Sequence, residues 1–441
     1  MRSRTTTHRF AGLAAVTSAA LVSLAVPASA HEPWDDGSIP PPPPSSPADG
    51  YSRDMHLLGT SEHTGGVNSD LAFKGDLVFA GHYGGFRVID VSEPGAPVEM
   101  ADVHCPGPQG DVSVHGDLLF LSVDTPQSEP GCDSHNATAT TPGMFEGVRI
   151  FDISDPAAPE LVKTVQTDCG SHTHTLLPDP ANDRLLVYVA SYPLSRSGIG
   201  PDCQAPFNRI SVIEVPDGDV AAAHVAAEPE VTGQPFGASF GVPPFFACHD
   251  ITVLVPKRTA AAACLSEGQL WDISDPLAPR ITDHVDTPDV DIWHSSAFTH
   301  DGKVVVFGDE YFGSPKEPFG SLWFYDVADP STARSHLRIP RDEPSTYHNF
   351  NVVPVRDRYV LVSSAYGSGT SVVDFTDVAA PKEIGHYDMR SNQWSTYFYN
   401  GLVVANDISR GVDVLRFSDR AFAGATKLPH LNPQTQEVLI G

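Results

Sequence analysis

The chain has 441 residues and a formal net charge of −28, from 27 basic and 55 acidic residues. Nucleic acid and anionic membranes repel a surface this acidic, so we expect neither as a partner. Beyond residue 30 the sequence has no run of about 18 apolar residues, so we expect no membrane span.

The first thirty residues follow the pattern of a secretory signal peptide. Arg2, Arg4 and Arg9 precede the apolar stretch FAGLAAVTSAALVSLAV, and ASA at residues 28–30 is a small-residue cleavage sequence. We therefore predict that residues 1–30 are removed and that the mature protein is secreted to the extracellular space.

Residues 31–53 are rich in proline, with PPPPPSSP at their centre. Proline has no backbone N–H to donate, and such a segment buries little apolar surface. We predict an extended linker.

Residues 54–420 contain a repeated motif. VIDVSEP, IFDISDP and LWDISDP each place an acid between apolar residues and end on a proline. The β-branched residues suit a pleated strand, and the proline stops it. The recurring acids are Asp90, Asp152, Glu214, Asp272, Asp326 and Asp374.

These repeats predict an all-β fold, a seven-bladed β-propeller with four strands in each unit. The seventh unit lacks a recognisable fourth strand, and DMHLLGTSE at residues 54–62 resembles the missing one. We expect this N-terminal strand to close the last blade, which removes the open edges of the array. Residues 421–441 remain as a C-terminal tail.

The VIDVSEPGAP, IFDISDPAAP and LWDISDPLAP copies resemble the LVIVD-repeat β-propellers of exported bacterial proteins. That resemblance implies the architecture and little chemistry. The blade LWDISDPLAPRITDHV is also similar to a blade of selenium-binding protein, a propeller family with methanethiol oxidase activity. The second similarity implies metal chemistry, although the chain has no copy of that family's cysteine motifs.

The six cysteines are even in number, and none forms a C-x-x-C pair. In an exported protein this favours disulfides over thiolate metal sites. Fifteen pairings are possible, and we favour neighbours in sequence because each pair then falls within one repeat. The expected pairs are Cys105 with Cys132, Cys169 with Cys203, and Cys248 with Cys264.

Four successive units begin their innermost strand with a histidine. These are His172, His249, His294 and His348. His174 is an alternative to His172 as the metal ligand from the first of these units. In a propeller such positions converge on the axis at one face. Neutral imidazoles there favour copper, iron or zinc. The alternative is that each histidine only binds water or neighbouring backbone, in which case no cofactor is needed.

The remaining units place small or aromatic residues at the aligned position: Ser69, Gly110 and Trp394. We expect that side of the ring to stay open to a substrate. Acids can orient metal-bound imidazoles through hydrogen bonds, and the candidates for this role are Asp250, Asp309 and Glu310.

Two functions follow from these patterns. The first is an extracellular binding protein with a histidine-lined metal site, whose partner is an unidentified ligand or protein. The alternative is a secreted oxidoreductase that uses copper or iron on the four-histidine site. The sequence assigns no catalytic residue and does not decide between them, because propellers serve many functions.

Overall fold

The structure is a computed structural model that describes residues 50–138, 140–192, 203, 207–236, 244–285, 290–311, 317–340, 345–389 and 391–440. The predicted signal peptide and most of the proline-rich linker lie outside the described residues. Within the described part, no helix is long and apolar enough to cross a membrane.

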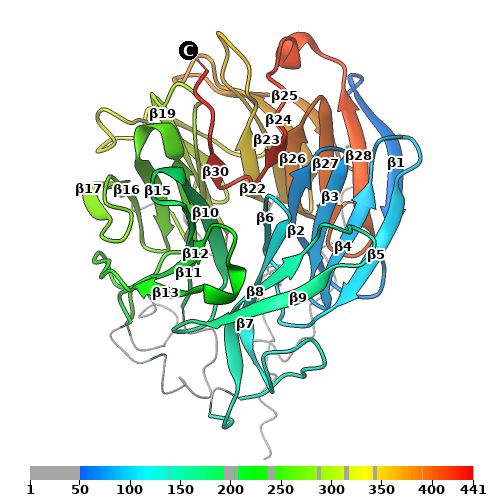
Figure 1. Ribbon diagram of the computed structural model, residues 1–441. Coiled ribbons are helices and arrows are strands. Elements are labelled where there is room, and N and C mark those ends of the chain that lie inside the picture. Colours follow the sequence, from blue (N-terminus) through cyan, green and yellow to red (C-terminus); the bar gives the residue numbers. More distant parts are fainter. Residues whose placement is uncertain are drawn as a thin grey trace, which may run out of the picture.

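The described chain forms an all-β propeller, in which antiparallel sheets surround a central axis (Figure 1). Each blade begins with its innermost strand and ends with its outermost one. Blade 1 consists of β2 (Asn68–Lys74), β3 (Leu77–His82), β4 (Gly85–Asp90) and β5 (Val98–His104). Blade 2 consists of β6 (Val112–His115), β7 (Leu118–Gln127), β8 (Phe145–Asp152) and β9 (Glu160–Gln166).

The next three blades repeat this order, with short 3-10 turns between some strands. Blade 3 consists of β10 (Thr173–Asp179), η1 (Pro180–Asn182), β11 (Arg184–Ala190), β12 (Ser211–Pro216), η2 (Val220–Ala222) and β13 (His224–Ala227). Blade 4 consists of β14 (Asp250–Leu254), η4 (Val255–Lys257), β15 (Thr259–Cys264), β16 (Glu267–Asp272) and β17 (Arg280–Val285). Blade 5 consists of β18 (Trp293–Phe298), β19 (Val304–Asp309), β20 (Leu322–Asp326) and β21 (Ser335–Leu337).

The rest of the ring is one eight-stranded sheet. Its first half is β22 (Thr346–Val352), β23 (Val360–Tyr366), β24 (Gly369–Asp374) and β25 (Lys382–Tyr387). Its second half is β26 (Gln393–Tyr399), β27 (Leu402–Asp407), β28 (Gly411–Phe417) and β1 (Met55–Glu62).

The arrangement differs from the predicted seven separate blades. The described residues form five separate blades and this eight-stranded sheet, because a parallel bridge between Asn349 and Ser395 joins β22 to β26 near the axis. The predicted closure by the N-terminal strand is present. Met55 to Glu62 pair antiparallel with Phe417 to Gly411, so β1 lies beside β28 (Figure 1).

The repeated acid of the sequence motif shapes a turn. Its carboxylate accepts the N–H of the residue two positions later in four copies, at 2.8 Å for Asp90 and Asp152, 2.9 Å for Asp272 and 3.0 Å for Asp374. Such a bond ends the strand and starts the turn that the following proline continues. The motif is therefore structural, and the site must come from other residues.

The last residues, expected as a tail outside the propeller, pack against the C-terminal ends of the inner strands. After η5 (Arg420–Phe422), β29 (His430–Leu431) pairs with β2 and β30 (Thr435–Gln436) pairs with β14. Asn432 hydrogen-bonds both backbone groups of Val114, at 2.7 and 2.8 Å. The segment therefore covers one end of the axis, and the inner strands begin at the other end.

Three disulfides link the pairs expected from the sequence: Cys105 with Cys132, Cys169 with Cys203, and Cys248 with Cys264. Disulfides are typical of proteins from oxidising compartments.

Candidate metal centre

The four predicted histidines lie together where the inner strands begin. Their side chains form a continuous arc, with ring centroids 4.4 Å apart for His172 and His249, 3.8 Å for His249 and His294, and 4.1 Å for His294 and His348. All four are buried, with at most 4% of their surface exposed. The repeat register inferred from the sequence therefore places the four imidazoles in one site.

Backbone irregularities aim some of these rings. The pairing of β18 with β19 shifts between Trp293 and Ser295, around His294. The pairing of β22 with β23 shifts between Tyr347 and Phe350, around His348. Such β-bulges reorient a side chain that a regular strand would direct elsewhere.

Glu310 lies between two of the imidazoles, directly after β19. Its Oε2 is 3.7 Å from His294 Nε2 and its Oε1 is 3.8 Å from His348 Nε2. It is 2% exposed, and neither oxygen accepts a hydrogen bond from the part of the chain that the structure describes. Burial, with contributions from Asp309 and Asp250, raises the pKa of Glu310 well above its usual value.

This carboxylate changes the expected ligand set. We predicted Glu310 as a residue that orients imidazoles, but its oxygens face the ring nitrogens themselves. One ligand atom each from His249, His294 and Glu310 lie within 4.8 Å of one another. Two imidazoles and a carboxylate are a donor set suited to iron(II) or zinc.

His348 is oriented as a metal ligand would be. Its Nδ1 lies 2.7 Å from the carbonyl oxygen of Trp394, which can only accept, so Nδ1 has the proton and Nε2 the lone pair. Burial lowers the pKa of His348 to about 3, so the ring is neutral near pH 7. Its Nε2 is also 2.8 Å from the hydroxyl of Tyr366.

The other end of the arc has a similar arrangement. His172 Nε2 is 2.9 Å from His249 Nε2 and 3.0 Å from the hydroxyl of Tyr192. Its Nδ1 is 3.0 Å from Asp124 Oδ2. Burial raises the pKa of Tyr192 well above its usual value, so its phenol keeps its proton.

Tyr192, Tyr366 and Asp124, which the sequence interpretation did not single out, share a position with Glu310. Each stands at or near the C-terminal end of the second strand of its unit. Because that strand runs antiparallel to the inner strand, its end reaches the same face as the inner strand's start.

The remaining predicted residues divide into those near the imidazoles and those with structural contacts. Asp250 Oδ1 is 3.5 Å from His249 Nδ1. Asp309 instead accepts the N–H groups of Asp291, Ile292 and Gly320, so it holds the backbone together. His174 is 3.0 Å from Asp111, and its Nδ1 is 2.8 Å from Ser122 Oγ.

Ser69 and Trp394 line the same cavity as the four histidines, which has room for about one water molecule. The Trp394 ring packs against His348, with ring centroids 5.2 Å apart, so the side expected to stay open to a substrate is occupied there. Gly110 does not line the cavity. A side chain at Gly110 would meet the carbonyl oxygen of His82 at 2.6 Å, so this glycine allows a close backbone approach.

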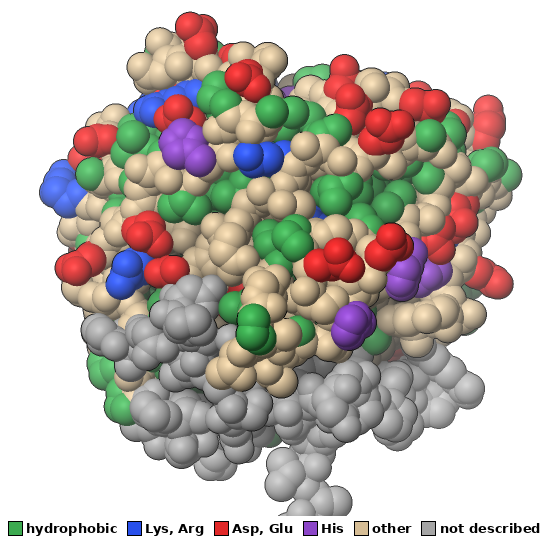
Figure 2. Space-filling model, turned by 60° about the horizontal axis from the view of Figure 1, so that its bottom comes forward, with side chains coloured by type: hydrophobic (Ala, Val, Ile, Leu, Met, Phe, Trp, Pro, Cys, Tyr) green, Lys and Arg blue, Asp and Glu red, His purple; other side chains and the backbone are tan. Residues whose placement is uncertain are grey.

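The cavity favours a cation. Asp70, Asp111 and Asp250 line it beneath the imidazoles, all buried. Burial and the neighbouring Asp111 raise the pKa of Asp70 to about 7. Burial, Asp111 and Asp70 raise the pKa of Asp250 well above its usual value. Carboxyl groups raise one another's pKa in this way when no positive charge lies between them. The outer surface is acidic too, with many acidic and few basic side chains on the face in Figure 2.

Comparisons with known proteins support the fold. Residues 65–104 and 145–167 match the LVIVD repeat. The WD40 β-propeller domain of Doa1 is similar in structure, with a TM-score of 0.50 and 10% identity over 84% of this chain and 99% of that one.

A putative 6-phosphogluconolactonase from Bacteroides fragilis has a TM-score of 0.53 and 11% identity, over 89% of this chain and 99% of that one. At such identities the likeness extends to the fold alone. No curated protein matches the chain, and the similarity to selenium-binding protein finds no support.

Proposed function

We propose that this protein is an exported propeller that binds one divalent transition-metal ion at the mouth of its axial channel. His249, His294 and Glu310 are the central ligands, and His172 and His348 flank them. The observation that supports this most strongly is Glu310, a buried carboxylate without a hydrogen bond in the described chain, 3.7 and 3.8 Å from two imidazole nitrogens.

The separations suit shared coordination. Zinc and similar ions bind imidazole nitrogen and carboxylate oxygen at about 2.0–2.2 Å, so two ligands of one ion lie at most about 4.2 Å apart. Both contacts of Glu310 fall below this limit and beyond hydrogen-bonding distance. Neutral imidazoles with one carboxylate favour iron, copper or zinc over calcium or magnesium.

Export is part of the proposal. The signal-like residues 1–30 and the three disulfides support an extracellular location. In this setting the protein binds an extracellular ligand or protein partner through the metal-loaded mouth.

A second candidate function is a metal-dependent oxidoreductase, which the two tyrosines favour. The phenols of Tyr192 and Tyr366 lie beside the outer imidazoles, and burial keeps both protonated. Each phenol can turn from its imidazole and donate a hydrogen bond to a small molecule that enters this cavity, which Ser69 and Trp394 also line. Iron or copper, when bound, would supply the one-electron chemistry.

Metal titration of the stripped protein tests the proposal. Calorimetry with Zn²⁺, Cu²⁺ and, without oxygen, Fe²⁺ would compare the unaltered protein with His249→Ala/His294→Ala. We expect the double variant to bind one ion fewer per chain. The control is His56→Ala/His224→Ala, which removes two exposed histidines and should change nothing. Equal stoichiometry and affinity in all three proteins would contradict the proposal.

A further inference from the structure

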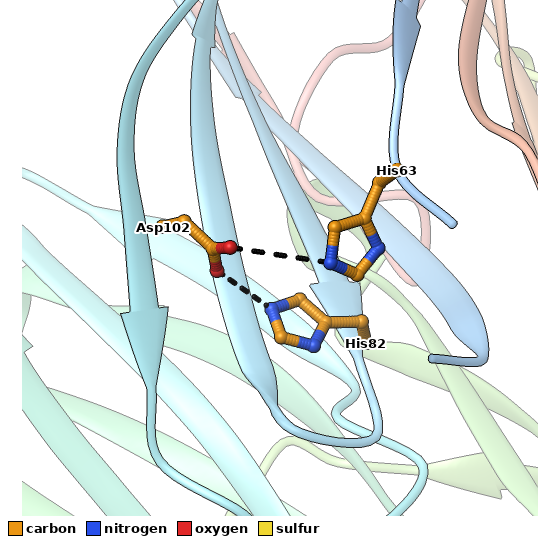
Figure 3. A group of neighbouring side chains, drawn as sticks. All are labelled: His63, His82 and Asp102. Carbon is orange, nitrogen blue, oxygen red and sulfur yellow. Dashed lines mark hydrogen bonds and ion pairs between the residues drawn. The ribbon is translucent and has the colours of Figure 1, made fainter. Parts of the chain in front are cut away.

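A second group of side chains that could hold a metal ion lies between the segment after β1 and blade 1 (Figure 3). His63 follows the closing strand β1, His82 ends β3, and Asp102 belongs to β5. One ligand atom from each lies within 4.8 Å of the others. Asp102 Oδ1 is 3.2 Å from His82 Nε2, and its Oδ2 is 4.0 Å from His63 Nε2.

The hydrogen bonds of Asn68 fix the orientation of His63. The Asn68 amide nitrogen donates to the carbonyl oxygens of His63 and Asp407, so its Oδ1 is an acceptor. His63 Nδ1 lies 2.6 Å from that oxygen and must donate to it. The second nitrogen of a neutral His63 therefore directs a lone pair towards the carboxylate of Asp102.

A lone pair that faces a carboxylate at 4.0 Å is a repulsive arrangement unless a positive charge lies between them. The guanidinium of Arg87 is near, but its Nε donates to Glu99 at 2.7 Å. A proton on His63 or a metal ion can supply the missing charge, and a metal ion would bind His63, His82 and Asp102 together.

We infer that His63, His82 and Asp102 form a second metal site, for Zn²⁺ or a similar borderline divalent cation. Two imidazoles and a carboxylate are the donor set of many zinc sites that keep a fourth position open. Both separations from Asp102 lie below the limit of about 4.2 Å for two ligands of one zinc ion. The side chain of Asp102 is 44% exposed, so solvent reaches the fourth position.

His82 can coordinate after a change of tautomer. Its Nδ1 accepts the N–H of Gly84 at 3.1 Å, so the neutral ring has its proton on Nε2, directed at Asp102. When zinc takes the place of that proton, the ring is protonated on Nδ1 instead and gives up the Gly84 bond. The ring stays neutral, and its hydrogen bonds with Gly84 and Asp102 are exchanged for a metal bond.

The site joins the segment that closes the ring to two strands of blade 1. Zinc there binds the folded chain and not the unfolded one, so it stabilises the native state. The inference does not depend on the mouth site, because the two groups share no ligand.

Zinc titration in a variant without the mouth site tests the inference. In the His249→Ala/His294→Ala background, calorimetry should find one Zn²⁺ per chain, and zinc should raise the melting temperature. Adding Asp102→Asn, an isosteric change at a half-exposed position, should weaken zinc binding at least tenfold and abolish the rise. Adding His56→Ala, in the neighbouring strand β1, is the matched control and should change neither.

Two results would overturn the inference: no zinc bound in the background variant, or binding that Asp102→Asn leaves unaltered. A failure of the mouth site gives a different result, since the unaltered protein and the background variant would then bind the same number of ions.

Discussion

Glu310 illustrates how a single buried charge indicates a ligand. Burying a carboxylate without a hydrogen bond is costly, and the protein has placed this one between two imidazoles with no arginine or lysine among the groups that shift its pKa. Protonation relieves the cost in the metal-free protein, and a cation relieves it in the loaded one. A proton and a metal ion therefore compete for the same carboxylate.

Replacing Glu310 with glutamine separates these effects. Glutamine keeps the shape and removes the charge, so we expect the metal-free variant to be at least as stable as the unaltered protein. Metal affinity should fall at least tenfold, because an amide is a poor ligand for iron, copper or zinc. Thermal melts and calorimetry check both expectations. A metal affinity unchanged by the substitution would remove Glu310 from the ligand set.

At the residue scale, the sequence predicts the four histidines because each stands near the start of the inner strand of a repeated unit. It does not predict the ligand role of Glu310 or the positions of Tyr192 and Tyr366. These residues come from second strands, whose units differ in length, and which of them reach the axis depends on strand pairing and bulges. No local pattern in the sequence records that.

At the element scale, side-chain bonds link neighbouring units at their turns. Asp301 lies in the hairpin between β18 and β19. Its carboxylate accepts hydrogen bonds from the Thr299 hydroxyl, the Lys303 backbone N–H and the hydroxyl of Tyr359, which directly precedes β23 in the next unit. Burial opposes its ionisation, but these hydrogen bonds outweigh burial and hold the pKa of Asp301 at about 2. Since the unfolded value is 3.8, the bonds stabilise the folded protein above pH 4 and lose their effect as the pH falls to 2.

The substitution Asp301→Asn should therefore destabilise the protein at pH 7 by on the order of 1 kcal/mol. The difference from the unaltered protein should shrink between pH 4 and pH 2, where the unaltered protein loses the same interaction. Denaturant unfolding at several pH values measures this. A difference that stays constant over that range would show that ionised Asp301 is not responsible.

The Cys248–Cys264 disulfide fixes the start of β14, because Cys248 directly precedes His249. We expect Cys248→Ser/Cys264→Ser to lose about 2–5 kcal/mol of stability and to bind metal more weakly. The matched control is Cys105→Ser/Cys132→Ser, whose disulfide joins no residue next to the four histidines, and which should lose stability without losing metal affinity at the mouth site. Calorimetry of both variants would contradict this expectation if their metal affinities fell equally.

At the scale of the whole molecule, the repeat predicts the propeller and its closure by β1. The acid-containing turn recurs in each unit and so predicts the same strand order throughout. The last unit lacks a fourth strand of its own and therefore requires a partner strand, which β1 provides. The joining of β22 to β26 by one bridge depends on how closely two inner strands approach at the axis. The sequence also does not predict that the C-terminal segment pairs with the ring, because its strands β29 and β30 have two residues each, too few to show an alternation of polar and apolar residues.

The whole ring has two different ends. The C-terminal segment covers the ends of the inner strands, while imidazoles and carboxyl groups meet at their starts. The proposed metal site therefore lies at the end of the ring opposite the C-terminal segment.

The most direct test is anomalous diffraction from crystals of protein purified without chelators or a histidine tag and supplied with iron, copper or zinc. Data collected on both sides of each metal's absorption edge identify the element and locate it. We expect a peak between His249, His294 and Glu310, absent in crystals of His249→Ala/His294→Ala. A map with no peak at the mouth, from well-folded protein supplied with each metal, would contradict this expectation.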